Sequence, residues 1–243
     1  MPDEHNTPDR SAKLAILDSP VYSIAEVSRL TKLNSNRVRR WLRGYDFVYE
    51  SPRGEYAFSR SQPVVEQTSG SRYASFLDLI DIVFVKQFLD RGVSLQHVRL
   101  ALAEAKEYLT RSHFAHETFF TDGRNIFLDL KEMGAHPQAL MKLLSGGQWA
   151  IAPIIKRFTE VIDFDTSTGY ARRWRPYRDL PVVLDPFVVF GRPTLKDRGI
   201  PTESVFEVYS AEGESVEAAM SWMRIPEEEA QGAIRFEQLL AAA

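Results

Sequence analysis

The residues that could do chemistry are crowded into one short stretch near the N-terminus. The stretch contains no carboxylate and places five hydrogen-bond donors close together: Asn36, Arg37, Arg39, Arg40 and Arg43. A guanidinium group presents its donors in a fork that fits two phosphate oxygens or the acceptor edge of guanine. The stretch therefore predicts binding to a polyanion, and duplex DNA is the one we expect.

The pattern around these donors predicts two short helices joined by a tight turn, within residues 22–45. Ser23 and Glu26 have the spacing of a capping box, which marks the start of the first helix. Asn34 or Ser35 can cap the second helix, which should end at Gly44. The buried positions are expected to be Ile24, Val27, Leu30, Val38, Trp41 and Leu42.

On the second helix Asn36, Arg39 and Arg43 share one face, and Arg37 and Arg40 share the next. Both faces cannot point at base edges, so one set should read bases and the other should hold phosphate. One helix offers only a few base contacts, which favours a dimer on two half-sites one or more helical turns apart. The alternative is a basic face that is merely solvated.

A β-hairpin is predicted directly after the second helix. Residues 47–49 and 56–58 read as its strands, and residues 51–54 as the turn, with Arg53 at the tip. A hairpin in this place can contact the DNA backbone or the minor groove. It can equally well serve only to cover the helix pair.

Composition bounds the remaining possibilities. The 243 residues are 44% hydrophobic, which is enough for one to three globular domains. Cysteine is absent, which excludes disulfides, thiol catalysis and thiolate metal sites and fits a cytoplasmic location. Residues 21–61 carry eight cations against four anions, whereas residues 203–243 carry two against nine. One end of the chain therefore suits a polyanion, and the other suits a protein partner or solvent.

The fold class expected is mainly α with small β-hairpins, an α+β protein. Residues 1–19 are expected to be a disordered tail and residues 20–110 a winged helix-turn-helix domain with two further helices, at 76–90 and 94–109. Residues 111–176 are expected to form a small α+β layer with hairpins at 119–127 and 161–174 and helices at 137–144 and 150–160. Residues 177–243 should contain three helices, which begin near Thr202, Ser215 and Pro226.

No pattern indicates catalysis or a bound cofactor. His113 and His116 could offer two metal ligands on one helix turn, but no third ligand of clear geometry accompanies them. Asp163, Asp165, Arg172 and Arg173 lie on paired strands, where cross-strand ion pairs account for them. The sequence has no nucleophile elbow, phosphate-binding loop or dinucleotide fingerprint.

Two stretches resemble known families. YSIAEVSRLTKLNSNRVRRW together with FLDRGVSLQHVRLAL is similar to the MerR-type winged helix-turn-helix. The C-terminal stretch resembles a small domain common in bacterial antitoxins, with the pattern DPxxxxGRPxxxxxxIP beginning at Asp185. Taken together, the chain looks like a VapB-type antitoxin of a type II toxin–antitoxin pair.

This resemblance implies two roles. One is neutralisation of a PIN-type ribonuclease toxin, whose acidic site holds Mg²⁺. The other is repression of its own operon by a homodimer bound to operator DNA. Arg192, Lys196 and Arg198 form a cationic loop in an acidic segment, so they are candidates to contact the toxin's carboxylates. No long coiled coil is visible, which leaves the dimer interface open. The alternative is a MerR-type regulator that binds a small-molecule effector in the middle layer.

Overall fold

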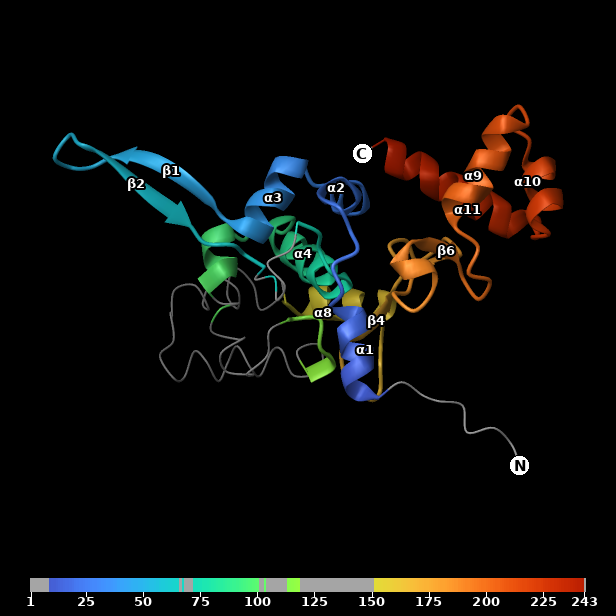
Figure 1. Cartoon of the computed structure of the whole chain (residues 1–243), viewed down its shortest axis with the longest axis horizontal. Coiled ribbons are helices and arrows are strands. Elements are labelled where there is room, and N and C mark those ends of the chain that lie inside the picture. Colours follow the sequence, from blue (N-terminus) through green and yellow to red (C-terminus); the bar gives the residue numbers. More distant parts are fainter. Residues whose placement is uncertain are drawn as a thin grey trace.

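The protein is an α+β molecule with helices and two small antiparallel sheets (Figure 1). The computed structural model describes residues 9–65, 67, 72–100, 103, 113–118 and 151–242, with the backbone alone for residues 151–155. One sheet is the two-stranded β1-β2 hairpin, and the other has four strands in the order β3-β4-β5-β6. Within the described residues, no helix is both long enough and apolar enough to cross a lipid bilayer.

The chain begins with a helix where a disordered tail was expected. α1 spans Arg10–Leu17, and the side chain of Leu17 is fully buried in the core. Lys13 Nζ lies 3.0 Å from Oδ2 of Asp165, which is 152 positions further along the chain. The expectation is therefore wrong for residues 9–19, because contacts from distant parts of the chain hold this polar segment in place.

The predicted helix pair is present. α2 spans Ile24–Thr31 and starts with the capping box of Ser23 and Glu26. α3 spans Ser35–Arg43 and is capped by Asn34, whose side chain accepts a hydrogen bond from the Asn36 N–H. Between them Lys32 adopts a left-handed conformation, which makes the turn tight. The local signals in the sequence placed both helices correctly.

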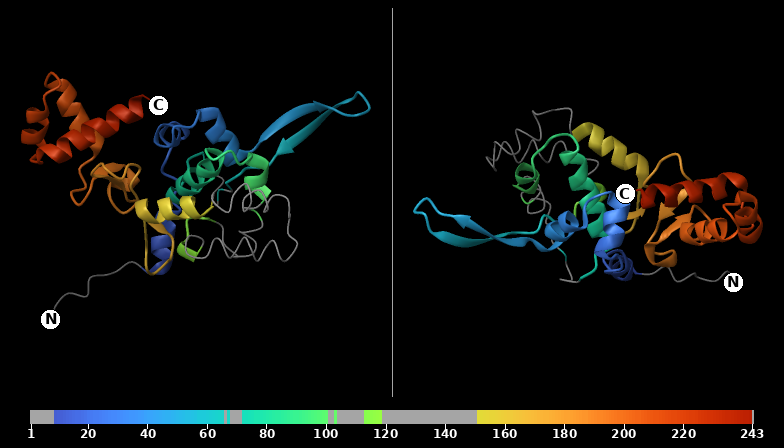
Figure 2. Two further views of the ribbon diagram at one scale, coloured as in Figure 1. Left: turned by 180° about the vertical axis from the view of Figure 1, so that it is seen from behind. Right: turned by 90° about the horizontal axis from the view of Figure 1, so that it is seen from above.

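α3 passes directly into a projecting hairpin. β1 spans Tyr45–Glu50 and β2 spans Tyr56–Ser61, each longer than predicted. At the junction Gly44 has a φ of +69°, and a Cβ there would collide with the Ser61 carbonyl oxygen, so only glycine fits. The hairpin extends away from the body of the molecule in every view (Figures 1 and 2).

The core of the N-terminal half is built around α4, which spans Phe76–Leu89. Ser75 and Asp78 form its capping box, and most of its side chains are buried, as the apolar run predicted. Residues 95–100 are helical, in agreement with the start of the next predicted helix. The remainder of that helix, the hairpin at 119–127 and the helix at 137–144 lie outside the described residues.

The four-stranded sheet joins the middle and C-terminal segments. α8 spans Ile151–Val161 and leads into β3, Ile162–Phe164, and then β4, Ala171–Trp174. β5, Val182–Leu184, and β6, Pro193–Leu195, complete the sheet, with the short 3-10 helix η1, Val189–Gly191, between them. The domain boundary predicted at residue 177 therefore falls between two paired strands of one sheet.

Three helices close the chain, as predicted. α9 spans Thr202–Ala211, α10 spans Val216–Met223 and α11 spans Glu227–Ala241. They pack around a small core of their own, which includes Val205, Ala219 and Ile234. The C-terminal end of α11 lies beside α2 (Figures 1 and 2). The helix pair is thus held from two sides, by α4 and by α11.

Candidate nucleic-acid interface

α3 presents all five predicted donors to solvent. Val38, Trp41 and Leu42 are its buried positions, and they anchor the helix in the core. The exposed side chains are Asn36, Arg37, Arg39, Arg40 and Arg43. The carbonyl oxygen of Trp41 also accepts hydrogen bonds from the N–H groups of Val64 and Val65, which fixes the segment that returns from the hairpin. The donors therefore stand on a rigid support.

The arginines of α3 do not form ion pairs with carboxylates of the described chain. No carboxylate in the described part of the chain forms an ion pair with any of them. The Arg39 guanidinium donates to Oδ1 of Asn36 at 3.0 Å, so these two side chains are presented together. Arg43 donates to the carbonyl oxygen of Arg72 at 3.0 Å. Cations in a last helical turn also favour the helix itself, but only Arg40 and Arg43 lie there.

The base of the hairpin adds residues that the sequence did not single out. The guanidinium of Arg40 lies over the ring of Tyr45, 4.7 Å from its centroid. Arg60 donates to the carbonyl oxygen of Arg43 at 3.2 Å, which ties β2 to the end of α3. These contacts depend on strand register, and an aromatic residue that follows a basic helix is a weak signal on its own. Arg53 is exposed at the hairpin tip, as predicted.

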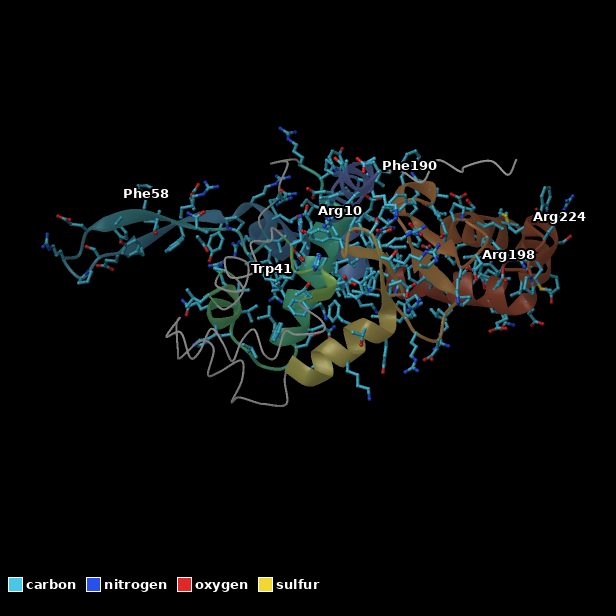
Figure 3. The ribbon with its side chains drawn as sticks, turned by 90° about the horizontal axis from the view of Figure 1, so that it is seen from below. Arg10, Trp41, Phe58, Phe190, Arg198 and Arg224 are labelled. Atoms are coloured by element: carbon cyan, nitrogen blue, oxygen red, sulfur yellow. The ribbon has the colours of Figure 1, made fainter. Side chains whose placement is uncertain are left out.

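The three cations proposed to contact a toxin do not form one site. Arg192 lines a cavity beside α2, whereas Lys196 and Arg198 line another on the far side of β6. Arg198 also forms an ion pair with Glu229, with 2.5 Å between Nε and Oε2. Figure 3 shows Arg198 well separated from Phe190, which is close to Arg192 in sequence. The three cations therefore do not line one cavity, and Arg198 is engaged with Glu229.

The residues of the DP and GRP motifs make contacts that stabilise this fold. The buried carboxylate of Asp185 accepts hydrogen bonds from Arg173 Nε at 2.6 Å and from the Phe187 N–H at 2.9 Å. Gly191 has a φ of +78°, and its carbonyl oxygen accepts a hydrogen bond from the buried Tyr22 hydroxyl at 2.7 Å. A Cβ on Gly191 would collide with that hydroxyl, so glycine allows the N-terminal segment to approach.

The predicted cross-strand ion pairs have different partners. Arg172 and Arg173 lie against Asp185, at 3.6 and 2.6 Å. Asp163 is bound by Arg175 through both of its oxygens at 2.9 Å. The prediction is wrong for Asp163 because Arg173, which lies opposite it in the register, binds Asp185 instead. The register then shifts between Asp163 and Phe164, so alternation does not decide the partner of Asp165.

The remaining aspartate of that prediction, Asp165, receives Lys13 from α1. Burial by itself would raise the pKa of Asp165, but hydrogen bonds from Ser167, Lys13 and the Thr168 N–H outweigh it and hold the pKa well below its usual range. The carboxylate is thus a charged anchor for α1. Nothing in these contacts points to catalysis.

His113 is a buried cation rather than half of a metal site. Its Nδ1 lies 3.1 Å from Oδ2 of Asp81, and its Nε2 lies 3.3 Å from Oδ1 of Asp18. Burial alone would lower the pKa of His113, but the hydrogen bonds to Asp18 and Asp81 outweigh it and raise the pKa to about 10. His116 packs edge-on against Tyr170. Among the residues described, no group of three or more ligand-type side chains is placed to hold a metal ion.

A cavity of about 430 Å³ lies between the helix pair and the C-terminal helices. Arg29 and Leu30 of α2 form one wall, and Glu237 and Leu240 of α11 form the other. Burial raises the pKa of Glu237, although the hydrogen bond that it accepts from Thr202 acts in the opposite direction. The cavity therefore combines apolar side chains with two half-buried acids, Glu26 and Glu237, next to the proposed DNA-binding helices.

The chain is similar to a curated protein and to a solved structure, both from Mycobacterium tuberculosis, and no protein-family model matches it. It is 24% identical over 199 residues to the protein named "Putative antitoxin VapB45", a match that covers 77% of this chain and 82% of that protein. The crystal structure of Rv2018 shares the fold with a TM-score of 0.68 at 20% identity, and the match covers 90% of this chain and 99% of the other. The first similarity supports a distant relationship to an antitoxin.

Proposed function

We propose that the protein is an antitoxin that binds a cognate ribonuclease toxin of PIN type and also binds its own operator DNA as a repressor. The observation that carries the DNA half is the face of α3, whose four arginines and Asn36 are exposed on a rigid helix and free of carboxylate partners within the described residues. The antitoxin half is supported by the similarity to a protein that bears that name, over most of both chains. Neither role requires catalysis or a bound cofactor.

Binding to DNA would use α3 in the major groove, with the side chains divided between bases and backbone. Arg39 and Asn36 are joined by a hydrogen bond and form a paired group that suits a base edge. Arg40 lies against Tyr45 at the base of the hairpin, and this position suits a phosphate of the adjacent backbone. A homodimer is proposed because one helix provides too few contacts for useful affinity.

Toxin binding is proposed to use the acidic C-terminal part of the chain, with two of its exposed cations as candidates. Arg192 and Lys196 lie in different cavities, so single charge reversals separate their contributions. Arg198 is a poor probe, because its reversal would also break the ion pair with Glu229.

Co-expression with the product of the neighbouring reading frame tests the antitoxin half. The wild-type chain is expected to restore growth and to be retained by the tagged toxin. Arg192→Glu or Lys196→Glu should reduce retention at least ten-fold while leaving operator binding unchanged, because a reversed charge would face the toxin's acidic site. The control is Arg91→Glu, a similarly exposed cation in the turn that follows α4. Retention that is unaffected by both reversals would show that the toxin binds elsewhere.

One observation favours a second candidate function, an effector-responsive transcription regulator. The cavity between α2 and α11 has the size of a small-molecule site and touches the helix pair directly. The product of the neighbouring gene separates the two candidates. A PIN-type protein that is toxic when expressed alone favours the antitoxin, whereas a metabolic or efflux protein favours the regulator.

A further inference from the structure

The projecting hairpin exposes several large apolar side chains to solvent. Tyr56 and Phe58 on β2 are 77% and 84% exposed, and Val48 on β1 is 53% exposed. Neither outer edge of the hairpin pairs with another strand of the described chain. A two-stranded sheet alone is marginally stable in water, and an open edge with exposed aromatic residues is a template for another strand.

The hydrogen-bond pattern shows which backbone groups are free at each edge. The Ser51 N–H donates to the Glu55 carbonyl oxygen, so the pair 51/55 is a hydrogen-bonded one. Bonded and non-bonded pairs alternate in an antiparallel ladder, so the next bonded pairs are 49/57, 47/59 and 45/61. The free N–H and C=O groups on β2 therefore belong to Tyr56, Phe58 and Arg60. Those on β1 belong to Asp46, Val48 and Glu50.

The charged side chains on each strand indicate which of the two edges can pair with the same edge of a second copy. A symmetric antiparallel pairing of two β1 edges, centred on Val48, would place Asp46 of one copy opposite Glu50 of the other, twice. Like charges directly opposite each other destabilise a sheet. The same pairing of two β2 edges, centred on Phe58, places the two Phe58 side chains opposite each other and Arg60 opposite Tyr56. Aromatic pairs and a cation over an aromatic ring are favourable in these positions.

We propose that two copies of the chain dimerise through the β2 edges of their hairpins and form a four-stranded antiparallel sheet with Phe58 at the two-fold axis. The occupant of the open edge is thus a second copy of this chain. The register centred on Phe58 is preferred, because it pairs the free backbone groups of all three residues, Tyr56, Phe58 and Arg60, on that edge. Edge pairing also keeps the same face of both hairpins on one side.

This orientation suits a single DNA duplex. Arg40 lies against Tyr45, so edge pairing turns the two Arg40 side chains in the same direction, whereas stacking the hairpins face to face would turn them in opposite directions. Tyr45 precedes Val48 by three positions, which at about 3.3 Å per residue and about 4.8 Å between strands separates the two Tyr45 residues by roughly 24 Å. α3 ends just before Tyr45, so the two helices lie at the outer ends of these strands. One turn of B-DNA separates half-sites by about 34–36 Å. The part of the inference that concerns a single DNA duplex rests on the proposed function.

Cysteine cross-linking tests the interface directly, because the chain has no cysteine of its own. In the proposed dimer the two Cα atoms at position 58 would lie about 5.5 Å apart, which is within the range of a disulfide. Under mild oxidation Phe58→Cys should form a covalent dimer at least ten-fold faster than the control Val48→Cys. The two residues at position 48 would lie about 14 Å apart, across three strand spacings. Equal rates, or no dimer from Phe58→Cys, would overturn the proposal.

Proline substitutions supply a second measurement by sedimentation equilibrium. Phe58→Pro removes an N–H that the hairpin itself does not use, so the fold should survive while the dimer weakens at least ten-fold. Val48→Pro makes the same change on the other edge and should leave the dimer intact. A monomeric wild-type chain, or a Phe58→Pro variant that dimerises normally, would reject the interface.

The result is separable from the proposed function. If the chain fails both edge tests but the wild type still binds the operator, the proposed dimer is wrong and the proposal of DNA binding remains. If the dimer passes both edge tests and binds no DNA, the interface is supported and the proposal of DNA binding is wrong. If Phe58→Pro abolishes retention by the toxin and leaves dimerisation unchanged, the edge belongs to that partner, and the proposal for a second copy is wrong.

Discussion

At the scale of single residues, the decisive feature is the difference between side chains that have internal partners and those that do not. Arg173 and Arg175 are bound to buried or half-buried aspartates, and Arg198 is bound to Glu229. Arg37 and Arg39 have no carboxylate partner in the part of the chain that the structure describes, although they are equally charged. Arginines with carboxylate partners are thus concentrated around the four-stranded sheet, whereas those of α3 have none among the described residues.

Arg39 and Arg40 should respond differently to truncation if they act on bases and on phosphate. Arg39→Ala is expected to cost about 1–3 kcal/mol on the preferred operator and to weaken the preference among sequences. Arg40→Ala should weaken binding uniformly and reduce the slope of log K against log salt by about 1. Fluorescence anisotropy at several salt concentrations, on operator and scrambled duplexes, measures both. Identical behaviour of the two variants would contradict the assignment.

The buried His113 should make stability depend on pH. Its pKa is raised from 6.5 to about 10, so its contribution to stability is fully present below about pH 6.5 and is lost as the pH rises towards 10. The free energy of unfolding of the wild type should therefore fall across this range more steeply than that of His113→Asn. Urea denaturation at a series of pH values measures the difference. Parallel curves would show that the ring is not charged in the folded protein.

The sequence predicted the exposure of the α3 side chains better than the ion pairs of the sheet. The donors of α3 were found because their exposure follows from helical spacing over a few residues. The partners of Asp163 and Asp165 were not found, because Arg173 binds Asp185 in place of Asp163, and Asp165 binds Lys13, which lies 152 positions away. Partners brought together by tertiary packing leave no periodic signal in the sequence.

At the scale of elements, local capping signals were the most reliable guide. Ser23 with Glu26 and Ser75 with Asp78 mark the first turns of α2 and α4, and Gly44 marks the end of α3. α1 has no comparable signal, because no side chain caps it and it carries no acid in its first turn. It is helical because Leu17 enters the core and Lys13 reaches Asp165, which is information outside the segment.

Alanine substitutions test whether α1 is part of the folded unit. Leu17 is fully buried, so Leu17→Ala should lower the free energy of unfolding by about 2–5 kcal/mol. Leu14 lies on the same helix but is exposed, so Leu14→Ala should change it by no more than about 0.5 kcal/mol. Thermal or urea denaturation measures both. A neutral Leu17→Ala would restore the disordered tail that the sequence suggested.

At the scale of the whole molecule, the N-terminal and C-terminal parts are more closely joined than the sequence suggested. The four-stranded sheet crosses the predicted boundary, Tyr22 is bonded to Gly191, and α11 lies beside α2. A partner bound near α11 is therefore well placed to affect α2 and α3, the helices proposed to bind DNA. Such a connection would couple toxin binding to repression, and by linkage the coupling would work in both directions.

The central claim is that the arginine face of α3 binds duplex DNA, and one measurement tests it most directly. Binding of the DNA upstream of the gene is compared between the wild type, a triple variant Arg37→Gln, Arg39→Gln and Arg40→Gln, and a control with Arg10, Arg91 and Arg224 changed to Gln. The control removes the same charge from exposed positions elsewhere on the molecule.

The α3 variant is expected to lose at least a hundred-fold in affinity while unfolding at the same temperature as the wild type, and the control should lose no more than a few-fold. Equal losses in the two triple variants would mean that only net charge matters. Binding that survives in the α3 variant would contradict the account.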